Sequence, residues 1–538
     1  MIDFFSILLL ASLAVPLVLL GACFVTRWRP HALALQWLAP IAALATGLAG
    51  LNHAPVTFDL PLLGFTLRLD PPGALLLASA ALLWIVVSAS LSRDRRPDNR
   101  FGLCWLLTMI GNIGVFVAGD LISFYLLYAL ASIPAYGLFA ISDDSERKRA
   151  GAIYMAFTIL GEAILLLAFA MLVASEPHGS SRITDVMESL AASPWREAAL
   201  GLIVAGFGIK VGMIPFNGWM PLTYSAAPIP AAAVLSGAGV NAGVIGLIRF
   251  LPLAIPMESW GGALAAMGFL SAFYGVAFGL TQRKPKVILA YSSISQMGVV
   301  AAALGMALIN GQADASVDVA FYAANHLLVK AALFLTVGAL ATRRTRLSNT
   351  TFILAALLAL SLAGLPLTGG ALAKLATKAQ FASGTGAVLA TLSSIGTALL
   401  MTHFLICLAA PPRDAVQECP ASLIRFLPAV ALGAILLPWA FYPEVGAVSY
   451  ALEFRNFVDG LWPVALGAGL AFVLGRMRFS PDVPVGDTIV FGEAAFRRLL
   501  SIGPSIETLD ARLRQWPAAG VSLLSIVLAL LMAGLLGS

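Results

Sequence analysis

The sequence is poor in charged residues. Only 11% of its 538 residues are Asp, Glu, Lys or Arg, whereas 60% are hydrophobic and the mean hydropathy is +0.92. A typical soluble domain is about 25% charged, and a single water-soluble core stops growing at about 250–300 residues. The chain therefore has more apolar surface than a soluble core can bury, and its composition predicts an integral membrane protein.

Residues that bind cofactors are also scarce. The four cysteines are scattered, and none forms a CxxC pair or lies at ligand spacing from a histidine. This excludes a disulfide framework and gives no support for a zinc site or a cysteine-ligated iron–sulfur cluster. No nucleotide-binding loop or haem motif is present either, so the sequence predicts no cofactor, no metal and no catalytic chemistry in this chain.

The basic residues are few and lie in short loops. The net charge of +5 is small for this length, which argues against a nucleic-acid partner and for the lipid bilayer as the main surroundings. Lys and Arg concentrate in alternate loops, at Arg27 and Arg29; Arg93, Arg95, Arg96 and Arg100; Arg147, Lys148 and Arg149; Arg283, Lys284 and Lys286; Arg343, Arg344 and Arg346; Arg413; and Arg476 and Arg478. If the first helix runs from outside to inside, all of these loops lie on the cytoplasmic side. The pattern predicts a multi-pass protein of a bacterial-type inner (cytoplasmic) membrane.

Long apolar runs fill most of the chain. A spanning helix needs about 20 mostly apolar residues, and about 16 segments meet that rule. They lie near residues 4–25, 32–51, 72–92, 101–118, 120–141, 150–173, 197–219, 229–251, 260–280, 286–308, 317–340, 351–372, 385–408, 422–442, 460–477 and 516–536. The first segment has no basic residues before it, so we interpret it as a retained span and not as a cleaved signal.

Two connecting segments have patterns of their own. The alternation in TFDLPLLGFTLRLD predicts a short hairpin on the outer surface within residues 52–70. Residues 480–515 are polar and amphipathic, which predicts a surface segment before the last span.

Ionisable side chains at membrane depth are costly and usually functional. The apolar segments contain Glu162, Lys210, His326, Lys330, Lys374, Lys378 and His403, and Asp120 at a helix end. Desolvation disfavours the charged form of a buried lysine, so Lys210 can take up and release a proton near neutral pH. Pro215, five residues on, predicts a helix break whose free carbonyls can bind water or cations. The alternative is a lysine that reaches the membrane surface or pairs permanently with a carboxylate.

The other ionisable residues differ in what they indicate. His326 and Lys330 lie four residues apart, on one helical face. Pro366 predicts a second helix break, shortly before Lys374. Lys378 lies near the outer helix end, where solvation is the simpler explanation, and His403 is more typical of a hydrogen-bonded core histidine.

Glu162 is the one carboxylate that we place deep in a span. A buried carboxylate without a cation is costly or neutral, and Lys210, on the next span, is its candidate partner. The alternative is a protonated and inert glutamic acid in a polar pocket.

Four stretches carry a resemblance to a known family. They are GFGIKVGMIPFNGWMPLTYSAAPIPAAAVLSGAGVNAGVIGLIRF, KPKVILAYSSISQMG, NHLLVKAALFLTVGAL and GLPLTGGALAK. Together they resemble helices seven, eight, ten, eleven and twelve of the antiporter-like membrane subunits of proton-pumping NADH:quinone oxidoreductase, multisubunit Na+/H+ antiporters and membrane-bound hydrogenases. The resemblance covers roughly residues 60–410. It implies an all-α membrane fold of about 14 core helices, with two inverted five-helix repeats that each contain a broken helix.

The resemblance also implies roles for individual residues. Lys210 matches the proton-carrying lysine of the seventh helix, His326 and Lys330 match the central relay, and Lys374 matches the ionisable residue of the twelfth helix. Three positions depart from the family pattern: Ala129 stands where the fifth helix normally has a glutamate, Asn241 replaces a lysine, and Asn217 replaces a histidine. We expect Glu162 to substitute for the glutamate that is missing at Ala129; otherwise the first half-channel is degenerate.

These observations predict an organisation and a function. The N-terminal helices and hairpin occupy residues 1–100, the first half-channel repeat 101–252, the second repeat 259–410, and the C-terminal helices with the amphipathic segment 411–538. The main hypothesis is a proton-translocating subunit of a multisubunit energy-coupling complex, in which protons move along Glu162, Lys210, His326, Lys330 and Lys374. Its partners would be other membrane subunits, with either a redox module of the iron–sulfur or hydrogenase type or a soluble zinc protein. The alternatives are a Na+/H+ antiporter subunit, the membrane partner of a proton-coupled inorganic-carbon uptake system, and a structural scaffold with degenerate transport.

Overall fold

The computed structural model describes residues 4–51, 55–60, 64–94, 99–142, 144–341, 348–381, 384–410, 421–476 and 483–493. The chain divides into two compact units, residues 1–485 and residues 486–538. The described part of the second unit is a short helix over 487–493. The predicted span over 516–536 and most of the predicted amphipathic segment over 480–515 lie outside the described residues.

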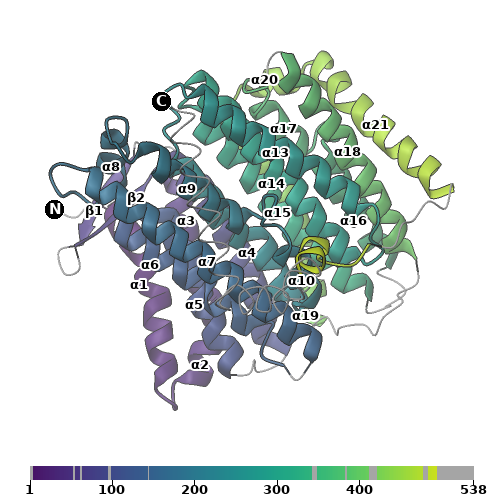
Figure 1. The fold of residues 1–538 in the computed structure, drawn as a ribbon. Helices are drawn as coiled ribbons and strands as arrows, with labels where there is room; N and C mark the ends of the chain where they lie inside the picture. The colour runs from purple at the N-terminus through teal and green to yellow at the C-terminus, as the bar shows by residue number, and fades with distance from the viewer. Residues whose placement is uncertain are drawn as a thin grey trace, which may run out of the picture. The chain divides into compact units, whose positions relative to one another are not determined.

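The first unit is a helical bundle (Figure 1). Its N-terminal half contains α1 (Phe4–Phe24), α2 (Arg29–Ala34), α3 (Ile41–Gly50), β1 (Val56–Leu60), β2 (Phe65–Leu69), α4 (Pro71–Asp94), α5 (Asn99–Val117), α6 (Leu121–Ser132), α7 (Ser145–Ser175), α8 (Ile183–Leu190), α9 (Arg196–Val211), α10 (Trp219–Ala226), α11 (Ile229–Val234) and α12 (Val240–Phe250). The rest contains α13 (Glu258–Gly279), α14 (Pro285–Asn310), α15 (Ala315–Ala341), α16 (Ser348–Ala363), α17 (Gly369–Ala376), α18 (Gly384–Ala409), α19 (Ala421–Phe441), α20 (Val448–Ala451) and α21 (Phe454–Arg476).

These helices confirm the predicted membrane character. Within the described residues, 12 helices are long and apolar enough to cross a membrane. The span predicted over 32–51 is wrong as one continuous helix: α2 and α3 are separate, with a 3₁₀ turn at Gln36–Leu38 between them. Pro40 precedes α3 and has no backbone N–H to continue a helix from α2, which explains the interruption.

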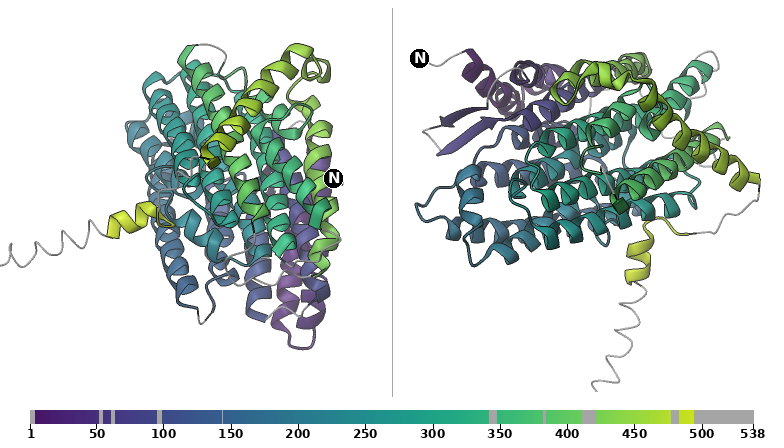
Figure 2. Two further views of the ribbon diagram at one scale, coloured as in Figure 1. Left: turned by 90° about the vertical axis from the view of Figure 1, so that its right-hand side faces the viewer. Right: turned by 90° about the horizontal axis from the view of Figure 1, so that it is seen from above.

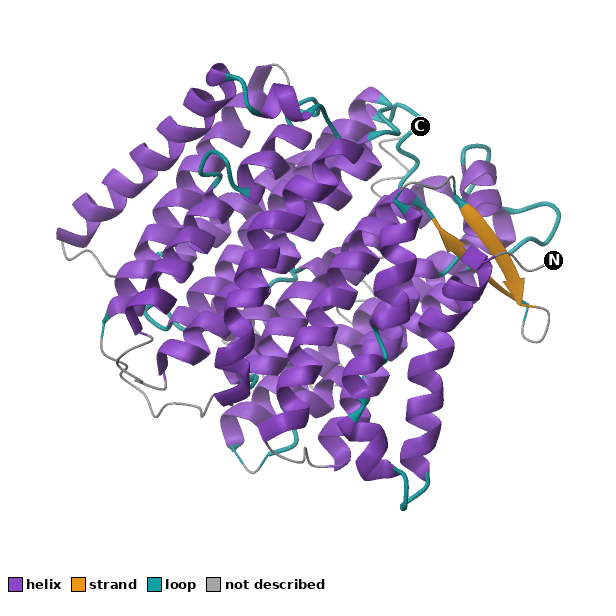
Figure 3. Ribbon diagram, turned by 180° about the vertical axis from the view of Figure 1, so that it is seen from behind, coloured by secondary structure: helices purple, strands orange, loops and turns teal. Residues whose placement is uncertain are grey.

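The predicted hairpin is confirmed. β1 and β2 pair antiparallel, from Val56 opposite Leu69 to Leu60 opposite Phe65, and lie at one end of the bundle, as the orange strands in Figure 3 show. Asp120 fixes this hairpin to α6, because its carboxylate accepts the Thr66 N–H at 2.7 Å and also caps the first turn of α6. We call this end of the first unit the hairpin end. The opposite end, where α2 lies, is the basic end.

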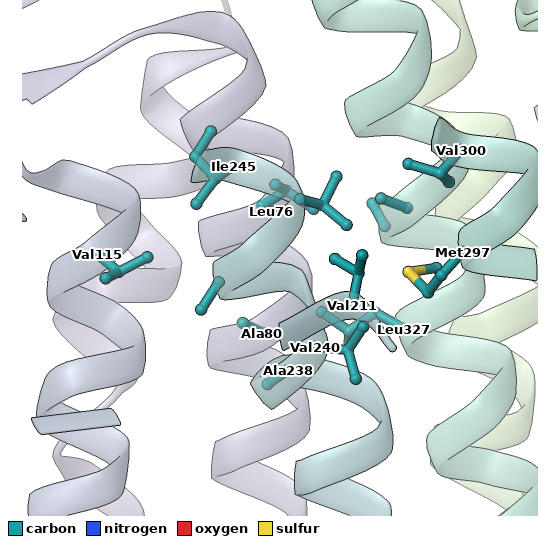
Figure 4. Close-up of a cluster of buried hydrophobic side chains, with 14 of the residues drawn as sticks. Leu76, Ala80, Val115, Val211, Ala238, Val240, Ile245, Met297, Val300 and Leu327 are labelled. Carbon is teal, nitrogen blue, oxygen red and sulfur yellow. The ribbon is translucent and has the colours of Figure 1, made fainter. Parts of the chain in front are cut away.

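The centre of the first unit is formed by α14 and α15. Their candidate spanning windows are 100% and 89% buried, against 22% for α1 and for α21. Small residues let α13 and α14 approach closely: a Cβ added at Gly268 would lie 2.4 Å from the Ala302 nitrogen, and one at Gly298 would lie 2.5 Å from the Ala272 nitrogen. Figure 4 shows part of the apolar core, where side chains from α4, α12, α14 and α15 meet.

Segments far apart in the sequence lie side by side in this unit. α19 packs against both α4 and α15, and the view from the hairpin end shows C-terminal helices beside the purple N-terminal ones (Figure 2, right). The predicted boundaries at residues 101, 252, 259 and 411 stay predictions.

Candidate functional site

The first helix break lies between α9 and α10, at the predicted position. α9 ends at Val211, Gly212 follows in the left-handed conformation (φ +72°), and Pro215 lies in the connection. One carbonyl at the end of α9 has a partner across the break, since the indole nitrogen of Trp219 donates to the Ile209 carbonyl at 2.8 Å. Lys210 lies in the last turn of α9, where the negative end of the helix dipole favours a cation.

Lys210 binds a hydroxyl on α6. Its ammonium donates to Ser132 Oγ at 2.7 Å and lies 5.5 Å from the centre of the Tyr128 ring. Its aliphatic stem lies against α12, where a Cβ added at Gly243 would be 3.0 Å from Lys210 Cβ. Ser132 is three residues beyond Ala129 and thus one helical turn further along α6. The direct acceptor for Lys210 is therefore a serine that the sequence analysis did not single out.

Glu162 and Lys210 are brought to the same small cavity, as the candidate pairing requires. The cavity has a volume of about 20 Å³ and is lined by both side chains together with Ser132, Tyr154 and others. Within the described part of the chain, the two residues form no ion pair within 4.0 Å, and Glu162 Oε1 has no protein hydrogen-bond partner. A polar cavity needs about 10–15 Å³ to hold one water molecule, so this one has room for a single bridging water.

The central pair lies on α15 and is fully buried. His326 and Lys330 both have 0% exposed surface. Lys330 donates to the Leu289 carbonyl on α14 at 2.7 Å, whereas neither ring nitrogen of His326 has a partner in the described structure.

The second break separates α16 from α17 and surrounds Pro366, as predicted. Gly364 has φ +97°, and Gly370 lies so close to α16 that an added Cβ would be 1.6 Å from the Ser361 carbonyl oxygen. Lys374 on α17 reaches back and donates to the Ala363 carbonyl, the last residue of α16. The two breaks thus share one feature: a lysine lies beside each of them. Lys210 belongs to the last turn of α9, and Lys374 binds the carbonyl at the end of α16; the helix dipole favours a cation at both of these helix ends.

A larger cavity lies beside the second break. Its volume is about 740 Å³, and its polar lining includes Tyr322, Lys374, Lys378, Thr397 and Asn456. Lys378 is 46% exposed and pairs with Asp459 at 3.5 Å, which agrees with the prediction of a solvated lysine. The lining comes from α15, α17, α18, α20 and α21 among other elements.

Several buried polar atoms near these residues have no protein partner among the described residues. They are Glu162 Oε1, both side-chain atoms of Asn217, Asn241 Oδ1, Asn325 Oδ1 and both ring nitrogens of His326. Buried polar groups are almost always hydrogen-bonded to protein or to ordered water. Water is the remaining partner, so the arrangement suits a hydrated path.

Two other buried groups have structural roles. His403 Nε2 lies 2.8 Å from the Gln282 carbonyl, as expected of a hydrogen-bonded core histidine.

Arg249 on α12 donates to both oxygens of Asp70 and to three carbonyls at the end of α5. Burial raises the pKa of Asp70, but the Arg249 guanidinium, with smaller contributions from Arg68 and the Gly73 N–H, lowers it, and the resulting pKa lies below its ordinary value. No local pattern in the sequence indicates this pair, because its members are 179 residues apart.

The described residues contain no group of three or more His, Cys, Asp or Glu side chains that could hold a metal ion. The ionisable side chains of the candidate site inside the bundle are Lys210 and Lys374 beside the two helix breaks, Glu162 within α7, and His326 and Lys330 within α15. Fold and site together define a multi-pass membrane protein of the antiporter-like class.

The comparisons with known proteins identify the family. Residues 118–400, more than half of the chain, match the family described as NADH:quinone oxidoreductase/Mrp antiporter, TM, and the chain belongs to it. It is 28% identical over 336 residues to hydrogenase-4 component B of Escherichia coli, which covers 57% of this chain and 49% of that protein. It is 31% identical over 371 residues to a probable K+/H+ antiporter protein of Rhizobium meliloti, covering 64% of this chain and 36% of the relative. The chain thus spans less than half the length of these two relatives.

A solved structure has the same fold. The Mrp complex from Dietzia sp. DQ12-45-1b aligns with a TM-score of 0.74 and 21% identity, over 100% of this chain and 63% of that one. These comparisons confirm the predicted family and the all-α membrane fold with broken helices. They leave the roles of individual residues as proposals.

Proposed function

We propose that this chain translocates protons as the antiporter-like membrane subunit of a multisubunit complex. Protons load onto Lys210 beside Glu162, move through bound water to Lys330 and His326, and reach Lys374 and the cavity next to it. The observation that carries the proposal is the position of three lysines: each is placed against a carbonyl or hydroxyl oxygen inside an apolar bundle, two of them at helix breaks.

The placement argues against an inert scaffold. Burying a lysine among apolar helices is costly, and an anchor for partners gains nothing from three such residues. Position 129 has an alanine instead of a glutamate, but the first half-channel still contains a carboxylate. Glu162 supplies it, because Glu162 lines the same cavity as Lys210.

A second candidate function is that of a cation/proton antiporter component. It is favoured by the likeness to the Rhizobium meliloti protein, whose name gives K+/H+ antiport. The likeness to hydrogenase-4 component B favours a redox partner for the main proposal. In either case we expect other membrane subunits as partners and an inner-membrane location with the basic end in the cytoplasm.

The test is proton flux in proteoliposomes that contain the tagged chain with whatever co-purifies in mild detergent. Lys330→Met keeps the length of the side chain and removes its charge, so we expect it to abolish flux. Lys378→Met is the matched control, because that lysine is half exposed and pairs with a half-exposed Asp459, so it should tolerate the change. Wild-type flux in Lys330→Met would overturn the proposal. Flux that depends on added Na+ or K+ would select the antiporter candidate.

A further inference from the structure

α15 carries four titratable residues, and they are evenly spaced along the helix. Asp318, Tyr322, His326 and Lys330 follow each other at intervals of four residues, and α15 has no others. Side chains four residues apart are neighbours on a helix surface, so the four form a continuous row that extends over about 18 Å and winds by about 120° around the helix. α15 begins at the hairpin end, so this row leads from the buried Lys330 towards that end. We call it the α15 row.

Tyr322 lies where the α15 row meets the large cavity. Its side chain lines that cavity, and its hydroxyl donates to Gln296 Oε1 at 2.7 Å. Gln296 in turn donates to Thr397 Oγ1 at 3.0 Å, and Thr397 lines the cavity as well. These hydrogen bonds hold the Tyr322 phenol in the wall of the cavity. His326, the next member of the row, has no protein hydrogen-bond partner in the described structure.

Asp318 ends the α15 row at the hairpin end. It is partly exposed, and Gln380 donates to its Oδ2 at 2.9 Å. A carboxylate with one oxygen held by an amide keeps its other oxygen for exchange with water. Neither Asp318 nor Tyr322 is used by the path through Lys374.

We propose that the α15 row is a proton-release route to the hairpin end, with Tyr322 as its relay and Asp318 as its terminal acceptor. The inference rests on the proposed function, since it names the exit of the same path. In the relay step, the Tyr322 O–H turns from Gln296 Oε1 to a cavity water and gives that water its proton, while the phenol oxygen takes a proton that His326 passes on through water. The cavity water then passes its extra proton to the Asp318 carboxylate, which releases it at the hairpin end. The phenol gains one proton and loses one, so it stays neutral. Gln296 holds the hydroxyl between these steps and is a positioning residue.

The test measures proton flux per reconstituted complex for Tyr322→Phe, which removes only the hydroxyl. Losing a positioned proton-transfer group costs about 10²–10⁴-fold in enzymes, so we expect flux to fall at least about tenfold. Tyr224→Phe is the matched control: this fully buried tyrosine also loses one hydrogen bond, to the Leu235 carbonyl, but lies off the α15 row. We expect it to retain flux.

A second pair of variants separates relay from packing. Asp318→Asn can still accept the hydrogen bond from Gln380 but cannot ionise, so we expect reduced flux, and Asp318→Glu should restore it. Wild-type flux in both Tyr322→Phe and Asp318→Asn, with flux lost in Lys374→Met, would overturn this inference and leave the proposed function standing. Absence of flux in the wild-type complex would instead overturn the proposed function. If Tyr322→Phe does not assemble, the comparison of Asp318→Asn with Asp318→Glu decides.

Discussion

The contact between Lys210 and Ser132 yields a quantitative prediction for Ser132→Ala. The substitution removes the oxygen that lies 2.7 Å from the ammonium and leaves the Ser132 carbonyl, which accepts the Tyr154 hydroxyl. A hydrogen bond to a charged group contributes about 1.5–3 kcal/mol. Because about 1.36 kcal/mol corresponds to a tenfold change, protonated Lys210 should become about ten- to hundredfold harder to form.

The assay is proton flux against the pH of the loading side in proteoliposomes. In Ser132→Ala, flux at neutral pH should fall by that factor, and it should recover when the pH is lowered by about one to two units, because the higher proton concentration offsets the weaker binding. Ser236→Ala is the control, since Ser236 is also fully buried and its hydroxyl donates to the Ala233 carbonyl, at 3.4 Å, and not to an ionisable group among the described residues. A pH profile in Ser132→Ala that matches the control would refute the reasoning.

Two further predictions concern the carboxylates. Glu162→Gln should reduce proton flux as much as Lys210→Ala does, because it removes the charge that faces the shared cavity; unchanged flux would show that Glu162 does not replace the missing glutamate. Arg249→Met should lower the free energy of unfolding in detergent by about 3–5 kcal/mol at pH 7, since it leaves Asp70 buried without its cation. Because Arg249 lowers the pKa of Asp70, the stabilisation by the pair is present above the ordinary aspartate pKa and is lost as the pH falls through the lowered value. The difference between variant and wild type should therefore shrink in acid, and equal denaturation midpoints at neutral pH would contradict the structural role.

The helices and the helix breaks could be predicted from the sequence, because both depend on residues that are close together in the chain. Apolar runs have the length of a span, and Pro215 and Pro366 interrupt them where no i→i−4 hydrogen bond can form. The hairpin over β1 and β2 followed from simple alternation. The interruption before α3 also has a proline, Pro40, within an apolar run. The apolar residues on both sides of it nevertheless predicted one continuous span.

The contacts of the site were less accessible from the sequence. Ser132 is an ordinary residue at a helix end, and nothing local indicates that Lys210, 78 residues later, donates to it. The approach of Glu162 to Lys210 depends on how α7 packs against α9, which no local pattern specifies. The α15 row is visible in the sequence as a spacing of four residues. Asp318 and Tyr322 were nevertheless not predicted, because an aspartate near a helix end and a tyrosine in an apolar helix are both common without a functional role.

The packing of α19 against α4 has a consequence for biogenesis. About 330 residues of chain lie between the end of α4 and the start of α19, and a ribosome adds about 5–20 residues per second. For tens of seconds, then, the face of α4 that α19 later covers is turned towards lipid or an insertion factor, whereas the face of α15 waits for only about 80 residues of further synthesis. A nascent chain arrested before residue 421 would therefore hold its buried lysines in a bundle that lacks the helix covering α4 and α15.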